Sequence, residues 1–548
     1  MEIASEAIKT YAMDHHGLIA GVCRDIGLVE KIDKRINKHD PRRIVSTGTA
    51  TLAMIINGLG FTNRRLYLTP QFFETKPVER LLGKDIFSHH LDDNALGKAL
   101  DEIYDYGASK LFGEIAFEIA LENNLLGALA HLDSTSLSVE GEYEKGSREN
   151  VINLTYGHSK DHRPDLKQAV MSLVVSGKGA IPLWMEPQDG NSADKKTFHE
   201  TIKRVRAFQK ELKGCPEFKW VADSALYAKE KLLKQTDYLW ISRVPETIQE
   251  ARELVEKLDV EITWLDRGNG YKTASFYSHY GAVKQRWLLV YSDQSYHREK
   301  KTFTKKLTDQ EEVLKKALWH LEHEIFACEL DATKELNKII KKFPYHCITS
   351  KIVSVLKHSK SGRPKKEAIG EAIGYQVQSE VARNSSEIEI FLNRKGRFIL
   401  ATNDLDKVAF PDEDILKEYK DQQSVERGFR FLKDPWFMVD SVFLKSPHRI
   451  EALMMVTTLC LLVYNISQYR LRTTLKETHE TLPNQLNKPI QNPTMRWIFQ
   501  VMEGIGIILF YEKDSCKSVK EIITNLSELR RKIIRLFGGS VQKIYEIP

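Results

Sequence analysis

The sequence has 548 residues, of which 42% are hydrophobic and 28% are charged, and its formal net charge is +6. This composition is typical of a folded globular protein and excludes the disordered and fibrous classes. At about 150 residues per domain the length predicts three or four domains. The mild positive charge permits a polyanionic partner without requiring one.

Features of secreted and membrane proteins are missing from the sequence. No two of the six cysteines form a C-x-x-C pair, which favours a reducing cytoplasm over a disulfide framework or a zinc ribbon. The N-terminus lacks the basic and apolar regions of a signal peptide. The longest apolar stretch, residues 452–466, spans about 15 residues, fewer than a membrane-crossing helix needs. We therefore predict a cytoplasmic protein with a buried helix there and no membrane partner.

Residues 1–125 are predicted to form a helical N-terminal domain. Apolar residues recur three and four positions apart in segments 17–36, 47–61 and 91–120, as they do on the buried face of a helix. Short basic turns separate these segments. The domain suits DNA binding, and dimerisation or packing is the alternative.

Residues 126–245 have the pattern of an α/β core. Apolar segments bounded by Gly, Pro or Asp predict a meander of three antiparallel strands, drawn from segments 126–139, 153–159, 168–176 and 181–187. A helix at 193–212 follows, and then a strand, a short helix and a second strand at 219–224, 225–235 and 237–244. This alternation is typical of an α/β fold.

Residues 246–397 interrupt the alternation, and we interpret them as an inserted β-rich α+β domain. They combine a charged helix with strand-like aromatic segments at 272–281, 284–292 and 388–393. The strand 397–404 and one long helix from about Glu413 to Lys433 then resume the core, which we place at 398–470. A helical C-terminal region, 471–548, is expected to serve dimerisation or contacts with DNA ends.

Two aspartates follow predicted strands of the core. Asp133 comes after the apolar residues 129–132, and Asp223 comes after Trp220-Val221-Ala222. A single Asp in such a place is ordinarily a turn former or a helix cap. Two of them on neighbouring strands of one sheet weaken that interpretation, because they bring two carboxylates to the same edge.

A third carboxylate is predicted on the helix that closes the core. Tyr419, Gln422, Glu426 and Lys433 are separated by 3, 4 and 7 residues, and at about 100° per residue they fall within an arc of about 60°. The alternative is a solvated helix face, on which Glu426 and Arg430 form an ordinary i,i+4 pair.

The chemistry of phosphodiester cleavage favours three carboxylates in this order. In-line displacement uses two metal ions about 3.5–4 Å apart, one for the attacking oxygen and one for the leaving oxygen. Mg²⁺ prefers hard oxygen ligands and keeps several waters, so three carboxylates and a substrate phosphate suffice. Histidine and cysteine are not needed, and His320, His323 and Cys328 lack the fourth ligand of a zinc site.

The order of strand Asp, strand Asp, β-rich insertion and helix Glu resembles that of the RNase H-like DDE transposases of insertion sequences. It is most similar to the group with the signature Y-(2)-R-(3)-E-(6)-K. This sequence reads Tyr419-(2)-Gln422-(3)-Glu426-(6)-Lys433, with glutamine in place of arginine. The resemblance, over about 125–245 and 397–470, implies an α/β RNase H-like core that is interrupted by the insertion and flanked by helical N- and C-terminal domains.

The resemblance also assigns roles. It implies that Asp133, Asp223 and Glu426 bind two Mg²⁺ ions, with Mn²⁺ as a substitute, and that Tyr419 and Lys433 contact DNA phosphates beside the cut. It implies cut-and-paste cleavage and strand transfer on double-stranded DNA, with terminal inverted repeats and target DNA as partners and a homodimer in the DNA complex. It implies a nucleoid-associated protein of a bacterium or archaeon. Gln422 can donate a hydrogen bond to a phosphate, but it lacks the charge and the bidentate fork of arginine.

An aromatic side chain of the insertion is expected, by the same resemblance, to stack on a base flipped out near the transposon end. Trp287 is preferred to Trp264 and Trp319, because two cations stand near it in the sequence. A place in the core of the insertion is the alternative for each tryptophan.

Further DNA contacts are predicted from basic segments. Lys160, Arg163 and Lys167 belong to the polar segment 158–168, which is a candidate phosphate contact or else a solvated loop. Arg363 has the Gly-Arg-Pro setting of a hook that inserts into the minor groove, or else lies in a basic linker.

Two other functions stay open. An RNase H-like nuclease, such as a junction resolvase, would use the same metals without joining strands, but it would need neither the insertion nor the terminal domains. A non-catalytic DNA-binding regulator derived from a transposase would not need all three carboxylates. The sequence leaves undetermined the inverted-repeat sequence, the target-site preference and the use of a hairpin intermediate.

Overall fold

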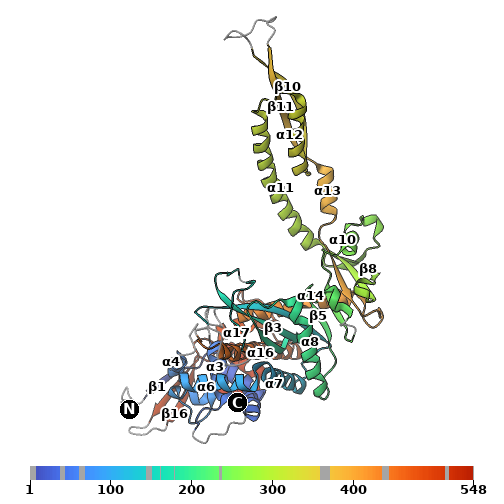
Figure 1. The fold of residues 1–548 in the computed structure, drawn as a ribbon. Coiled ribbons are helices and arrows are strands. Elements are labelled where there is room, and N and C mark those ends of the chain that lie inside the picture. Colours follow the sequence, from blue (N-terminus) through green and yellow to red (C-terminus); the bar gives the residue numbers. More distant parts are fainter. Residues whose placement is uncertain are drawn as a thin grey trace. The chain divides into compact units, whose positions relative to one another are not determined.

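The computed structural model describes residues 8–36, 43–60, 68–143, 151–160, 162–177, 179–233, 237–357, 371–434, 444–511 and 518–546. The chain forms two compact units (Figure 1). The first unit contains residues 1–242 and 417–548, and the second contains residues 243–416. The second unit is therefore inserted in the chain of the first. It extends beyond the predicted 246–397, because the strand and loop up to Leu416 belong to it.

A mixed sheet forms the centre of the first unit. Its strands are β2 (Leu129–Val139), β3 (Lys167–Ser176), β4 (Ile181–Gln188), β5 (Lys219–Ala222) and β6 (Trp240–Arg243). They are arranged in the order β4-β3-β2-β5-β6. The first three in the chain form the predicted antiparallel meander, and β2, β5 and β6 are parallel. Segment 153–159, expected to contribute to the meander, forms only one bridge, between Thr155 and Gln168.

Helices cover both faces of this sheet, which explains why β3 is buried from Gln168 to Ser176. On one face, Thr458 of α16 (Pro447–Glu477) lies 3.8 Å from the Sδ of Met171. On the other face, Trp184 of β4 packs against α7 (Ala108–Glu122), where a Cβ on Gly113 would lie 2.7 Å from the indole ring. A strand covered on both faces has to be apolar throughout. The connection from β4 to β5 contains α8 (Asp194–Glu211), and α9 (Lys229–Leu232) precedes β6.

Helix α16 is 31 residues long and packs against helices from both ends of the chain. It contacts α1 (His16–Asp25), α3 (Thr47–Gly58), α6 (Asp93–Tyr106), α7 and α18 (Glu528–Phe537). The helix is long and apolar enough to cross a membrane, but 78% of its apolar window is buried inside the protein. The predicted buried helix at 452–466 is confirmed.

The N-terminal region is helical, as predicted, but it belongs to the same compact unit as the core. It also contains α2 (Leu28–Ile36), α4 (Thr69–Glu74), α5 (Val78–Leu82) and a 3-10 turn at Ser88–His90. Its strand β1 (Ile8–Ala12) pairs with β15 (Gly506–Tyr511), and β15 pairs with β16 (Ser518–Thr524). The C-terminal region is thus not wholly helical; its other elements are β13 (Leu482–Pro483), β14 (Pro489–Ile490), α17 (Met495–Met502) and α19 (Gly539–Ile544).

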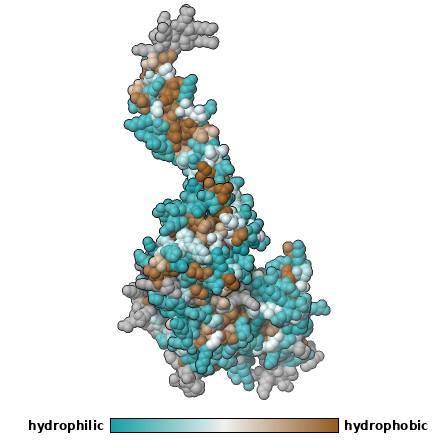
Figure 2. Space-filling model, turned by 90° about the vertical axis from the view of Figure 1, so that its right-hand side faces the viewer, coloured by the Kyte–Doolittle hydropathy of each residue, from teal (hydrophilic) through white to brown (hydrophobic). Residues whose placement is uncertain are grey.

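The second unit has an antiparallel sheet in the order β12-β9-β8-β7. Its strands are β7 (Leu265–Gly268), β8 (Tyr271–Ser278), β9 (Gln285–Ser292) and β12 (Arg397–Thr402). A separate strand pair, β10 (His346–Lys357) and β11 (Glu371–Arg383), packs against α11 (Asp293–Glu322) and α12 (Glu329–Lys342). The unit also contains α10 (Gln249–Glu256), 3-10 turns at Asp259–Glu261 and Tyr280–Ala282, and α13 (Ser385–Asn393). Figure 2 shows hydrophobic patches that interrupt a mostly hydrophilic surface.

Two predictions about secondary structure are wrong. Segment 388–393, expected to be strand-like, lies in α13, because the side chain of Asn384 caps the helix and Phe391 stacks on Phe303 with 4.1 Å between ring centroids. The single helix expected from Glu413 to Lys433 is divided. Helix α14 (Asp412–Asp421) ends before Gln422, and α15 (Gln423–Leu432) begins after it.

Candidate active site

The register of two parallel strands brings Asp133 and Asp223 to adjacent positions. In the pairing of β2 with β5, Leu132 is opposite Ala222, and each aspartate is the next residue of its chain segment. Neighbouring strands lie about 4.7–4.9 Å apart. The two strands are neighbours, as predicted, and Asp223 directly follows β5, but Asp133 lies within β2, which continues to Val139, and not at its end.

The carboxylate of Asp133 has a lysine beside it. Its Oδ1 accepts a hydrogen bond from the backbone N–H of Ser134 at 2.7 Å, and the Nζ of Lys160 lies 3.8 Å away. Lys160 Nζ also donates to the carbonyl oxygen of Ser134 at 2.6 Å and to its hydroxyl at 2.9 Å. The side chain of Asp133 is 18% exposed, so solvent and ligands can reach it.

Asp223 is fixed by the turn that follows β5. Its Oδ1 accepts a hydrogen bond from the backbone N–H of Ala225 at 2.8 Å, and its carbonyl oxygen accepts one from Ser242 of β6 at 2.7 Å. The aspartate therefore also acts as the turn former that the sequence allowed. This role leaves the carboxylate directly after the end of β5.

Helix α15 lies over the sheet face toward which Asp133 points. Asp133 is opposite Leu173 of β3, and directly opposed residues of antiparallel strands project to the same side. A Cβ on Gly428 of α15 would lie 3.6 Å from Leu173 Cδ2. His131 projects to the same side, since side chains alternate along a strand, and the charge of Asp421 in α14 acts on it. Burial is the larger effect and lowers the pKa of His131 to about 4.

Glu426 lies in the first turn of α15 as an exposed residue next to the buried Val425. Carboxylate oxygens are the donors that Mg²⁺ prefers, so the three residues fit this ion in kind. Among the residues that the structure describes, however, no three His, Cys, Asp or Glu side chains are gathered closely enough to hold one metal ion. The structure thus places the two aspartates at adjacent positions, and the joint site with Glu426 stays a prediction.

The remaining signature residues lie on two consecutive helices. Tyr419 belongs to α14, Gln422 separates the two helices, and Lys433 is the C-cap of α15. Gln422 is 8% exposed, and its Oε1 accepts no hydrogen bond from any described atom. Its backbone is helical, with φ −56° and ψ −25°, so the common face of the four residues stays a prediction.

The basic segment 158–168 is only partly engaged near the site. Lys160 lies beside Asp133, as described above. Arg163 forms an exposed pair with Asp165, with Nη2 and Oδ2 2.8 Å apart, and Lys167 donates to the carbonyl oxygen of Tyr143 at 3.0 Å. Of these three basic residues, Lys160 is thus the one whose side chain lies beside the Asp133 carboxylate.

The expectation that Trp287 stacks on a DNA base is wrong. Trp287 is 3% exposed and lies in β9 between Ala401 and Phe276 of the neighbouring strands. Its indole N–H donates to Gln285 at 3.1 Å, so it is a core residue of the second unit. Trp264 is half-buried and donates to Asp259 at 2.9 Å, whereas Trp319 is 55% exposed.

Arg363, the residue of the predicted minor-groove hook, lies outside the described residues.

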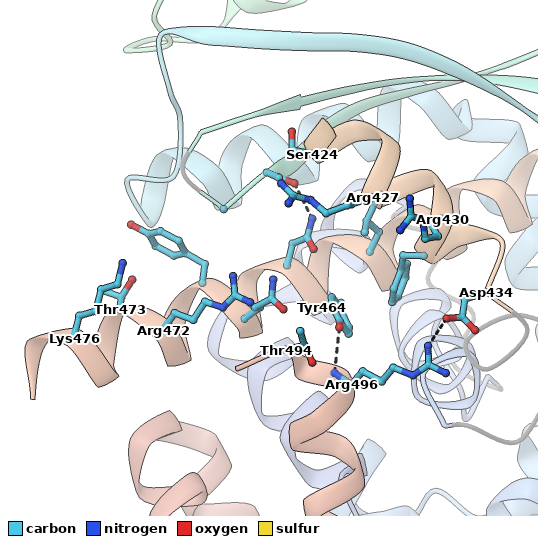
Figure 3. Close-up of a pocket in the computed structure, with 18 of the residues that line it drawn as sticks. Ser424, Arg427, Arg430, Asp434, Tyr464, Arg472, Thr473, Lys476, Thr494 and Arg496 are labelled. Carbon is cyan, nitrogen blue, oxygen red and sulfur yellow. Dashed lines mark hydrogen bonds and ion pairs between the residues drawn. The ribbon is translucent and has the colours of Figure 1, made fainter. Parts of the chain in front are cut away.

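A pocket of about 830 Å³ lies beside α15 in the first unit (Figure 3). Its basic lining residues are Arg427, Arg430, Arg472, Lys476 and Arg496. Sequence reasoning noted the charged segment around Glu426 but missed this group. The sequence does place Arg427 three residues from Arg430 and Arg472 four residues from Lys476, which is the spacing of neighbours on a helix face. Only the packing of α15 on α16, however, brings the two pairs to the same pocket.

Asp133 within β2 and Asp223 directly after the neighbouring parallel strand β5 are carboxylates at adjacent positions, and α15, the helix of Glu426, packs on the same sheet. The family model "Transposase DDE domain" matches residues 129–465, which is more than half of the chain. The protein therefore belongs to the transposase DDE domain family, and it is a DNA transposase by family. A second model, a domain of unknown function called DUF4277, matches residues 8–117.

Comparisons with individual proteins add little to this family assignment. No curated protein matches the chain. Among solved structures, the cryo-EM structure of the piggyBac transposase synaptic complex with hairpin DNA is similar at 10% sequence identity, with a TM-score of 0.38. The similarity covers 90% of this chain and 82% of that chain.

Proposed function

We propose that this protein is a metal-dependent DNA transposase of an insertion sequence, in which Asp133, Asp223 and Glu426 hold two Mg²⁺ ions. The adjacency of Asp133, within β2, and Asp223, directly after β5, carries the proposal. The strand order β4-β3-β2-β5-β6, with three antiparallel strands followed by two parallel ones, supports an RNase H-like core. The second unit is inserted between β6 and α15, ahead of the third carboxylate.

Two Mg²⁺ ions, when bound, supply an activated water or 3′-hydroxyl and stabilise the leaving oxygen of a DNA phosphodiester. Asp133 and Asp223 would hold the ions through carboxylate oxygens, together with Glu426 of α15, the helix that packs on β2 and β3. Lys160, 3.8 Å from Asp133, offsets the negative charge of that carboxylate and would contact a DNA phosphate.

The proposal extends to partners. The protein binds the terminal inverted repeats of its element as a homodimer, cuts at the ends, and joins the 3′-hydroxyls to target DNA. Tyr419 and Lys433 contact phosphates near the cut. Gln422, which is 8% exposed, is not included among these contacts.

The test compares the wild-type protein with Asp223→Asn on labelled DNA that carries the element's own ends, with Mg²⁺ or with EDTA. The control is Asp309→Asn, which removes the same charge from an exposed position of α11. We expect end-specific cutting and joining by the wild type and the control, and none by Asp223→Asn or in EDTA. Cutting without preference for the ends would point to a nuclease, and binding without cutting would point to a regulator.

Metal binding can be measured separately from cleavage. Titration calorimetry with Mn²⁺ should show two ions bound per wild-type chain, and weaker or fewer ions in Asp223→Asn. Equal binding by both proteins would contradict the assignment of the carboxylates.

A further inference from the structure

The first unit contains a second candidate site on α15, the helix that carries Glu426. We propose that the pocket between α15, α16 and α17 binds the phosphate backbone of DNA, with Arg427, Arg430 and Arg472 as the principal contacts. The proposal rests on the proposed function, because it takes DNA as the substrate.

The charge of the pocket favours a polyanion. Five basic residues line it, against two carboxylates, Asp434 and Glu477. Asp434 is engaged at the rim, where its Oδ2 lies 2.8 Å from Arg496 Nη1. Within the described part of the chain, Arg427, Arg430 and Lys476 have no ion pair or side-chain hydrogen bond. The positive charge therefore exceeds what the protein itself neutralises.

The basic residues come from three helices and surround one hollow. Figure 3 shows Arg427 and Arg430 along α15, Arg472 and Lys476 along α16, and Arg496 at the start of α17. This arrangement brings like charges together. Burial lowers the pKa of the Arg472 guanidinium, and the charge of Arg427 lowers it further. A bound anion would relieve this repulsion.

Arg472 is oriented before any ligand binds. Its Nε donates to the carbonyl oxygen of Pro493 at 2.9 Å, and its Nη2 donates to that of Asn492 at 3.2 Å. These bonds hold the guanidinium at the wall of the pocket, so little side-chain entropy is lost when it contacts a phosphate. A charged group placed in this way is a stronger binding element than a freely rotating lysine.

The neutral lining also suits a sugar-phosphate chain. Ser424, Thr473, Asn465 and Gln468 supply hydroxyl and amide groups, the kinds of side chain that contact DNA phosphates and sugars. An apolar small molecule would require a mostly hydrophobic and aromatic lining. The pocket is thus better matched to a phosphodiester backbone.

The position of the pocket links it to the cut. Arg430 is four residues from Glu426, so the two side chains lie one helical turn apart on α15, with Cβ atoms about 5–6 Å from each other. A strand whose scissile phosphate lay at the carboxylates would place its neighbouring phosphates, about 3.4 Å apart along the helix axis, toward the pocket. The pocket would thereby hold the strand in register for cleavage.

The test measures DNA binding without cleavage. The full-length protein is titrated in EDTA onto a fluorescein-labelled duplex carrying the element's ends, and fluorescence anisotropy is recorded over a series of NaCl concentrations. The variant is Arg427→Gln/Arg430→Gln. The control is Lys203→Gln/Lys210→Gln, which removes two charges from exposed positions of α8. We expect the slope of log Kd against log salt to decrease by about two units in the pocket variant, about one per cation lost, and to stay at the wild-type value in the control.

A second variant, Arg472→Gln/Lys476→Gln, repeats the test from α16, and circular dichroism with thermal melting shows whether each variant is folded. A wild-type salt slope in both folded pocket variants would overturn the proposal. A second combination of results would also overturn it. If inorganic pyrophosphate raised the melting temperature of the wild type but not of the variants, and the variants bound DNA with unchanged affinity, the pocket would bind a small anion and not DNA. Unchanged cleavage by Asp223→Asn would contradict the proposed function instead, whatever the binding slopes show.

Discussion

Gly428 lets α15 pack closely on the sheet. We expect a larger residue at this position to move α15, and Glu426 with it, away from β2 and β3. A Cβ at this position would lie 3.2 Å from Leu461 Cδ2 and 3.6 Å from Leu173 Cδ2. The first distance requires Leu461 to move by a few tenths of an ångström, and the second is ordinary contact. Gly428→Ala should therefore be tolerated, because alanine gains about 1 kcal/mol of helix propensity over glycine, which offsets the shift of Leu461.

Gly428→Val adds two methyl groups to a space already bounded on two sides. Overpacking of this kind costs about 1–3 kcal/mol, and the strain is relieved if α15 moves away from β2 and β3. A displacement of about 1 Å of a catalytic group costs about a hundredfold in rate. We therefore expect Gly428→Val to lose about that factor in Mg²⁺-dependent cleavage, while Gly428→Ala stays near the wild type.

The assays are urea denaturation, for the free energy of unfolding, and cleavage of end-labelled DNA under single-turnover conditions. Wild-type stability and cleavage in Gly428→Val would refute the argument that close packing of α15 positions Glu426. Equal losses in the alanine and valine variants would also refute it, because the effect would then not depend on added volume.

Two further predictions concern pH. Burial lowers the pKa of His131 to about 4, so the unfolded chain binds this proton more readily, and the free energy of unfolding falls as the pH decreases from about 7 to 4. His131→Leu should remove about 2 kcal/mol of this fall between about pH 7 and 5 in urea titrations, and an unchanged pH dependence would contradict the assignment. Burial raises the pKa of Glu451 to about 7, so this carboxylate destabilises the fold as the pH rises from about 4.5 through 7. Glu451→Gln keeps an acceptor for the N–H of Ile152, which lies 2.8 Å from the Glu451 carboxylate. The variant should be more stable than the wild type by about 1–2 kcal/mol at about pH 8 and should differ little from it at low pH. A variant that melts below the wild type at pH 8 would argue against this assignment.

Much of the core was predictable because its signals are local. The apolar segments before Asp133 and Asp223 predict strands, and β5 ends before Asp223 as expected, but β2 continues past Asp133 to Val139. The buried helix at 452–466 follows from its apolar composition. These segments and Glu426 lie within residues 129–465, which the transposase DDE domain model matches.

Other features depended on contacts between distant residues. The alternation of Ile388, Glu389 and Ile390 suits a strand, yet the cap at Asn384 and the stacking of Phe391 on Phe303 produce a helix. Trp287 follows two cations in the sequence, but strand pairing on both sides buries it in the second unit.

The sequence by itself therefore determined which residues carry the candidate chemistry and in what order, because strand endings and helix periodicity are properties of a few neighbouring residues. The tertiary structure decided which of them meet. It placed Asp133 beside Asp223 through the register of β2 and β5, and it buried the side chain of Gln422. It also joined basic residues of α15, α16 and α17 into one pocket, because packing brings together side chains that the chain separates by tens of positions.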